Sequence, residues 1–131
     1  MKHELKHTSI KNIIERMEKG TIKFDNPFIR TAGAWDKKMK VGLIHSLMRG
    51  FDINAISGYR ENDIFQVLDG HQRLTVIYDF INDRFENEDN LTFSKLLNED
   101  KETILNTDVM LVEYYDLTPE DQKEIFEVSN I

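Results

Sequence analysis

The feature that most constrains the fold is the segment from Phe65 to Phe80, FQVLDGHQRLTVIYDF. It opens as a largely apolar, non-alternating run that stops at Asp69, which is typical of a strand buried on both faces. Gly70 follows, and apolar residues then recur at helical spacing, which predicts a helix to about residue 83. These apolar positions are Leu74, Ile77, Tyr78 and Ile81. We therefore expect a sheet with this strand in its interior.

Helices and short strands are mixed irregularly along the rest of the chain. Helices are predicted from Ser9 to Gly20, from Asp36 to Gly50 and from Thr118 onward, because each begins at a good N-cap residue. Short strands are predicted around residues 21–27, in two stretches joined at residues 60–64, and at residues 108–115; residues 91–106 are expected to be helical or irregular. The positions expected to face the core include Met39, Leu97 and Val128. This order predicts an α+β domain with a small mixed sheet flanked by helices.

Composition limits the classes of protein to which this chain can belong. At 131 residues it is long enough for one domain with a core, and its formal net charge of −7 disfavours a broad phosphate-tracking surface, although a local basic patch stays open. It has no cysteine, and its histidines lack the spacing of metal ligands, so no metal site is expected. The start resembles no signal peptide, and no apolar run is long enough to span a bilayer. We expect a cytoplasmic protein that does not enter a membrane.

The end of the chain bears on domain organisation. The helix that opens at Thr118 and Pro119 meets no glycine or other stop signal before Ile131. We therefore expect residues 1–131 to form a single domain that is the N-terminal part of a longer protein.

Polar residues gather at the joint between the buried strand and the helix. The first N–H groups of a helix lack partners within it, and together with the helix dipole they favour an anion. Gly70 would let the backbone approach a ligand closely. Arg73, in the first turn, could fork onto a phosphate, and Asp69 could help to hold a metal-bound phosphate. His71 and Gln72 add further donors and acceptors at the mouth.

A purely structural interpretation of the same residues is equally open at this point. Asp-Gly is a common turn dipeptide, Asp69 could be a simple N-cap, and Arg73 could pair with Asp69 or with another nearby carboxylate. Trp35, the single tryptophan, could likewise contact a base or a partner, or it could be partly buried packing.

Three segments resemble one known family. They are VLDGHQRLTVIYDFIND, the upstream NPFIRTAGAWDKKMKVGLIHSLMRGFDI and the downstream LTPEDQKEIFEVSN. Together, and in this order, they resemble the DUF262 family, the type of domain found at the N-terminus of GmrSD- and SspE-like proteins. The first segment is similar to the Asp-Gly-Gln-Gln-Arg signature of the family, with His71 in place of the first glutamine.

The resemblance implies a fold similar to the ParB/sulfiredoxin group, in which a Gly-x-x-Arg turn binds nucleotide phosphates. It implies a nucleotide-binding or nucleotide-hydrolysing module of DNA restriction or phage defence. The residues that match the family pattern are Arg30, Asp69, Gly70, Gln72 and Arg73. His71 and Ile29 depart from it, since the family commonly has glutamine at both positions.

Two functions from different classes follow from these observations. In the first, a nucleoside triphosphate, with Mg²⁺ where it is hydrolysed, binds at Arg30, Gly70, Gln72 and Arg73, and the candidate catalytic residues are Asp69, His71 and Arg73. In the second, the chain keeps the fold but is a non-catalytic module that binds DNA or a protein. One form of this second hypothesis has the module encoded by a phage. DNA could also be bound through another domain or subunit. Nuclease activity within these residues is a third hypothesis and the weakest. Base preference, hydrolysis, host or phage origin and oligomeric state stay open.

Overall fold

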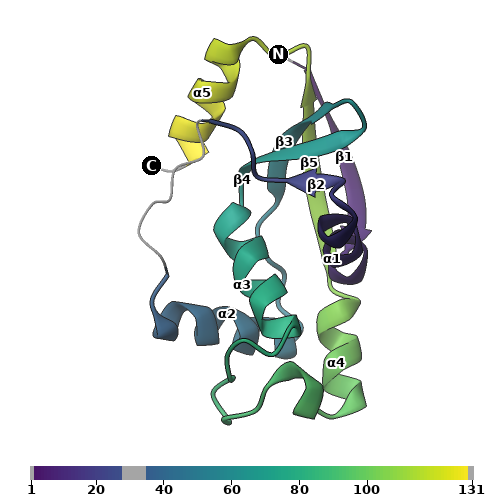
Figure 1. The fold of residues 1–131 in the computed structure, drawn as a ribbon, viewed down its shortest axis with the longest axis vertical. Helices are drawn as coiled ribbons and strands as arrows, with labels where there is room; N and C mark the ends of the chain where they lie inside the picture. The colour runs from purple at the N-terminus through teal and green to yellow at the C-terminus, as the bar shows by residue number, and fades with distance from the viewer. Residues whose placement is uncertain (1, 28–34, 130–131) are drawn as a thin grey trace.

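The computed structural model describes residues 2–27 and 35–129. They form a mixed five-stranded sheet in the order β1-β5-β3-β4-β2, with helices packed around it (Figure 1). The strands are β1 (Lys2–Ser9), β2 (Ile22–Lys23), β3 (Ile56–Glu61), β4 (Ile64–Asp69) and β5 (Asp108–Tyr115). The helices are α1 (Ile10–Lys19), α2 (Lys37–Met48), α3 (His71–Ile81), the short 3₁₀ helix η1 (Phe93–Lys95), α4 (Asn98–Leu105) and α5 (Pro119–Ser129). The predicted α+β class with a small mixed sheet is confirmed, whereas the ParB/sulfiredoxin-like assignment stays a prediction.

Strand β4 lies inside the sheet, as its largely apolar, non-alternating run predicts. It pairs antiparallel with β3 and parallel with β2, and its residues Phe65 to Leu68 are all buried. On the other side of β3 the order continues with parallel β5 and then antiparallel β1. The strand that leads into α3 is therefore held from both sides.

The hairpin between β3 and β4 turns on two residues with positive φ. Asn62 has φ 52° and Asp63 has φ 65°, a combination that suits a tight two-residue hairpin turn. Farther along β3, the pairing register shifts between Ser57 and Gly58. A Cβ at Gly58 would lie 2.1 Å from the backbone oxygen of Gln66, so no larger residue fits there without moving β4. This glycine sets how closely the two strands approach.

The helices begin and end largely where local sequence signals predict. The Ser9 hydroxyl accepts a hydrogen bond from the Asn12 amide, and Gly20, with φ 76°, ends α1. Asp36 caps α2 by accepting from the Met39 amide, and the hydroxyl of Thr118 caps α5. Helix α1 packs against β1 and β2, α2 against α3 and α4, and α5 against β4.

Among the described residues, sixteen buried apolar side chains form the core cluster between the sheet and the helices, including those of Ile10, Phe65, Leu74, Ile77 and Phe80. Three positions predicted to face the core do not, because Met39, Leu97 and Val128 are 48%, 73% and 62% exposed. Each lies in the first or last turn of a helix or at a helix cap, where apolar periodicity continues beyond the surface that could cover it.

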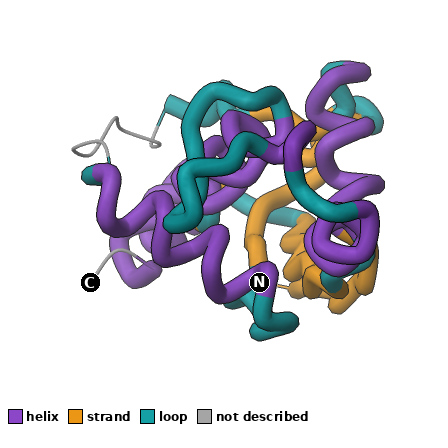
Figure 2. The backbone as a smooth tube through the Cα atoms, turned by 90° about the horizontal axis from the view of Figure 1, so that it is seen from below, coloured by secondary structure: helices purple, strands orange, loops and turns teal. Residues whose placement is uncertain are grey.

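Strand β1 is absent from the sequence prediction. Its residues Lys2 to His7 are all exposed, and Leu5 is the one aliphatic residue among them, so the segment carries no alternating pattern. It becomes a strand because β5 offers it an edge along its whole length. In Figure 2 the strand segments gather toward one side while helices and loops occupy much of the rest. Within the described ranges, no helix is long and apolar enough to cross a membrane.

Candidate functional site

The turn between β4 and α3 is built by five consecutive residues. Asp69 ends β4, Gly70 is the N-cap residue of α3 with φ 103° and ψ 4°, and the helix begins at His71. No side chain forms a capping hydrogen bond at this helix start. The reading of Asp69 as a simple N-cap is therefore wrong, because the left-handed Gly70 occupies the cap position. The positive end of the helix dipole faces this turn.

Gly70 has a steric role that does not depend on a ligand. A Cβ built at this position would lie 2.3 Å from Cδ1 of Ile56 and 3.2 Å from Nη2 of Arg73. A side chain would also be strained at this positive φ. Glycine is thus required for the turn to pack against the start of β3.

The guanidinium of Arg73 is held by backbone oxygens. Its Nη1 donates to the carbonyl of Asn54 at 2.5 Å and its Nη2 donates to the carbonyl of Ala55 at 3.3 Å. Nη2 also lies 3.7 Å from a carboxylate oxygen of Asp69, and the side chain is only 15% exposed. The predicted pairing of Arg73 with Asp69 is confirmed. Arg73 ties the segment before β3 to the first turn of α3.

The turn opens onto a small pocket of about 160 Å³. Its lining residues are Trp35, Asp69, Gly70, His71, Gln72 and Arg73. The structure therefore brings Trp35, from the segment just before α2, to the predicted turn residues, and leaves its side chain partly buried. Arg30 lies outside the described residues. The ring of Phe24 lies 6.4 Å from that of His71, between centroids, at one side of the turn.

The charged groups of the pocket are imperfectly compensated. Burial raises the pKa of Asp69, and this effect outweighs the opposing attraction of Arg73, His71 and the Gly70 amide. Burial likewise lowers the pKa of His71 in spite of the nearby Asp69. His71 is therefore neutral near pH 7, with a ring nitrogen able to accept a proton or a hydrogen bond. The site therefore combines a partly desolvated carboxylate, Asp69, with the neutral imidazole of His71.

Among the described residues, no group of three His, Cys, Asp or Glu side chains is placed to hold a metal ion. Asp69 is the one carboxylate among the described residues that line the pocket. This donor set suits Mg²⁺ only when a ligand supplies further oxygens, since Mg²⁺ is often held by one or two carboxylates together with substrate phosphates.

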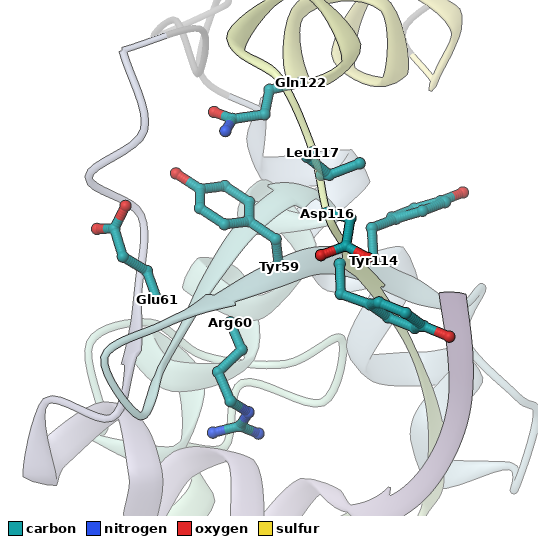
Figure 3. A pocket seen from close by; sticks show the side chains of 8 residues that line it. Tyr59, Arg60, Glu61, Tyr114, Asp116, Leu117 and Gln122 are labelled. Carbon is teal, nitrogen blue, oxygen red and sulfur yellow. The ribbon is translucent and has the colours of Figure 1, made fainter. Parts of the chain in front are cut away.

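A larger hollow of about 400 Å³ lies at the far ends of β3 and β5, and the sequence did not predict it (Figure 3). Tyr59 pairs with Tyr114 across the two parallel strands. In Figure 3 Tyr59 extends toward Gln122 of α5, while Arg60 points to the opposite side of the strand. The amide of Asn26 donates to the Tyr59 hydroxyl at 2.9 Å and to the Gln122 side-chain oxygen at 2.8 Å. These bonds hold α5 against the sheet.

Near this hollow, the carboxylate of Glu113 forms an ion cluster with two cationic side chains from neighbouring strands, Lys6 and Arg60. Glu113 of β5, with 8% of its side chain exposed, accepts from Nε of Arg60 at 2.6 Å and from Nζ of Lys6 at 2.5 Å. Burial would raise the pKa of Glu113, but the hydrogen bonds and charges of Lys6 and Arg60 together outweigh it and lower that pKa. The cluster was missed because its members come from three strands that are far apart in sequence.

Comparison with protein-family models gives a match that covers most of the chain. The family model described as "GmrSD restriction endonuclease, N-terminal domain" matches residues 10–130. The match includes the whole β4–α3 turn and begins immediately after β1. Searches of curated proteins and of solved structures found no match.

Proposed function

Because the chain belongs to the family of GmrSD restriction endonuclease N-terminal domains, we propose that it is a nucleotide-binding module whose phosphate site is the β4–α3 turn. The family links the chain to restriction proteins. The observation that carries the proposal is the pocket in which Trp35 and the residues from Asp69 to Arg73 meet at the positive end of α3.

The size of the pocket suits part of a nucleotide. Its 160 Å³ is well below the roughly 300–1,000 Å³ of pockets that enclose drug-sized ligands. It is close to the roughly 150 Å³ cavity that accommodates a benzene molecule. One phosphoryl group would therefore occupy the turn, with the base and ribose lying outside it, where Trp35 offers an aromatic face.

The contacts of Arg73 change the role that the sequence alone suggests for it. Since its guanidinium is committed to the carbonyls of Asn54 and Ala55, it acts first as a positioning residue that keeps the turn in shape. Its positive charge still favours a phosphate close by. Direct contact would come from the first turn of α3 and from the side chains of His71 and Gln72. A bound Mg²⁺ would neutralise phosphate charge and would stabilise the ionised form of Asp69.

Isothermal calorimetry with ribo- and deoxyribonucleoside triphosphates, with and without Mg²⁺, tests this proposal. The informative variants are His71→Ala, Gln72→Ala and Asp69→Asn, because Arg73→Ala would also release the segment before β3. Asp79→Asn, on the same helix but paired with Arg84 at 2.6 Å, is the matched control. We expect binding that the three pocket variants weaken at least about tenfold and the control preserves. Equal behaviour of all variants toward every nucleotide would refute the site.

A binding module without hydrolysis is the second candidate, and the committed guanidinium of Arg73 favours it. Hydrolysis requires charge stabilisation that grows in the transition state, and a guanidinium held by two carbonyls is poorly placed to move. Release of inorganic phosphate measured beside calorimetry separates the two: binding without release supports the non-catalytic module, and release that disappears in Asp69→Asn or His71→Ala supports the enzyme. Gel shifts over a salt series test direct DNA binding, which should weaken steeply as salt rises.

A further inference from the structure

Strand β1 is an open edge of the sheet. Within the described ranges it pairs with β5 alone, and its residues Lys2 to His7 are exposed. Such an edge presents backbone N–H and C=O groups to any strand that can align with it. The family match begins at residue 10, so β1 lies outside the part of the chain that resembles known relatives. Figure 1 shows β1 along the outer border of the sheet.

The side chains of β1 divide between the two faces of the sheet. Lys6 and Glu4 lie on the face of Glu113, since Lys6 reaches that carboxylate and Glu4 lies directly opposite it in the register. His3 and His7 lie on the other face, where they meet Tyr114 at 5.6 Å between ring centroids and Asp108 at 2.9 Å. Leu5 shares this second face and is 58% exposed.

We propose that β1 pairs antiparallel with β1 of a second copy of this chain, centred on Leu5, so that the two sheets become one. In this register Glu4 lies opposite Lys6 of the second copy, and Lys6 lies opposite its Glu4. Leu5 meets its own counterpart at the two-fold axis. The pairing covers residues 2–8 of both copies.

Symmetry, charge and the length of the pairing select this register. Directly opposite residues of antiparallel strands lie on the same face, so a two-fold axis between identical strands must pass through a residue pair. Centring on Glu4 would oppose two glutamates, and centring on Lys6 would oppose two lysines, both of which are unfavourable. Centring on His3 would oppose Lys2 and Glu4 but would pair a shorter stretch of β1. Centring on Leu5 opposes unlike charges twice, pairs residues 2–8 and buries an exposed leucine pair.

The ion pairs already present leave Glu4 available for this role. Within residues 2–27 and 35–129, its cation contact is with Lys6, at the long distance of 3.9 Å, and 61% of its side chain is exposed. Lysine on an edge strand ordinarily discourages pairing. In the proposed register, Glu4 of the second copy lies opposite Lys6. The lysine therefore disfavours pairing with other strands but favours pairing with β1 of a second copy.

Reciprocal charge variants test the proposal by sedimentation equilibrium over a concentration series. Wild type should dimerise. Leu5→Asp and Leu5→Lys each place like charges at the axis and should weaken dimerisation at least about tenfold, while circular dichroism and urea unfolding check that each chain folds. An equimolar mixture of the two should recover the dimer as a heterodimer. A monomeric wild type at all concentrations, or dimers that the single variants leave unchanged, would overturn the proposal.

Cysteine cross-linking gives a second test, because the chain contains no cysteine. Leu5→Cys should form a disulfide-linked dimer on mild oxidation, since directly opposite Cβ atoms lie about 4.5–5.5 Å apart. His3→Cys is the control: it would lie opposite His7, so its two copies would be separated by four residues, or about 13 Å along the strand. Equal cross-linking by both variants would contradict the Leu5-centred register.

Discussion

The pKa values of two carboxylates, Glu113 and Asp69, are shifted in opposite directions. Glu113 is the more buried, with 8% of its side chain exposed against 30% for Asp69. Even so, the pKa of Glu113 is lowered and that of Asp69 is raised. Burial raises the pKa of both carboxylates. At Glu113 the close hydrogen bonds and charges of Lys6 and Arg60 outweigh burial, whereas at Asp69 the attraction of Arg73 at 3.7 Å, of His71 and of the Gly70 amide does not.

This contrast separates a structural ion cluster from a candidate site. Arg60 and Lys6 are directed at the Glu113 carboxylate, so its charge is satisfied within the fold. Arg73 instead gives its hydrogen bonds to the carbonyls of Asn54 and Ala55. Asp69 is left partly desolvated beside a pocket. Such incompletely compensated groups are typical of functional sites, where a ligand can supply a further partner.

The largest expected effect on stability comes from Glu113→Gln. The amide would remove the carboxylate that Arg60 and Lys6 share and would leave Lys6 with Glu4 at 3.9 Å. Breaking a buried pair in this way costs about 3–5 kcal/mol. Because both cations are partly exposed and can regain water, we expect a loss nearer about 2 kcal/mol. Urea unfolding measures it, with Glu15→Gln on the exposed side of α1 as control. Equal urea midpoints for the two variants would show that the ion cluster around Glu113 does not stabilise the fold.

Arg73→Lys should have the next largest effect. Lysine keeps the charge but loses the planar fork that bonds the Asn54 and Ala55 carbonyls, which predicts a loss of about 1–2 kcal/mol. The control is Arg84→Lys, whose arginine lies on the surface with 58% exposure and should change stability by less than about 0.5 kcal/mol. A stability of Arg73→Lys equal to wild type would show that the backbone contacts do not hold the turn.

Asp69→Asn should change stability less than Glu113→Gln or Arg73→Lys, by less than about 1 kcal/mol in either direction. Its ionised form is disfavoured in the folded state, so neutralising it removes a cost together with the weak attraction of Arg73. Guanidinium unfolding next to Asp79→Asn measures the change. A loss as large as that of Glu113→Gln would break the contrast between the two carboxylates.

The pH dependence of stability should have opposite signs at the two carboxylates. The lowered pKa of Glu113 contributes stability that is present above the unfolded-state pKa and is lost as pH falls through the folded-state pKa. The raised pKa of Asp69 means that the folded protein binds this proton more tightly, so its cost disappears as pH falls through the folded-state pKa toward the unfolded value. Unfolding of wild type, Glu113→Gln and Asp69→Asn between pH 3 and 7 should show the two trends. Parallel curves for the two variants would contradict them.

The residues of the candidate site could be singled out from the sequence, whereas the ion cluster around Glu113 could not, and the reason is physical. The residues from Asp69 to Arg73 are consecutive, so a local strand-to-helix transition is enough to bring them together. Glu113, Lys6 and Arg60 meet only through the strand order β1-β5-β3, which local patterns do not encode. The same limit hid the carbonyl partners of Arg73, which precede β3. Strand β1 escaped prediction because Leu5 is its one aliphatic residue, and pairing with β5 supplies what its pattern lacks.

Carboxyl NMR titration of Asp69 and Glu113 in one sample, before and after addition of ATP with Mg²⁺, tests the central claim most directly. Without nucleotide, Asp69 should titrate above the ordinary range of aspartate and Glu113 below that of glutamate. With nucleotide and Mg²⁺, the pKa of Asp69 should fall, because its ionised form gains the bound Mg²⁺ as a partner, while that of Glu113 should not move. An Asp69 pKa that begins at or below the ordinary value, or that nucleotide leaves unchanged, would contradict the assignment of the β4–α3 turn as the binding site.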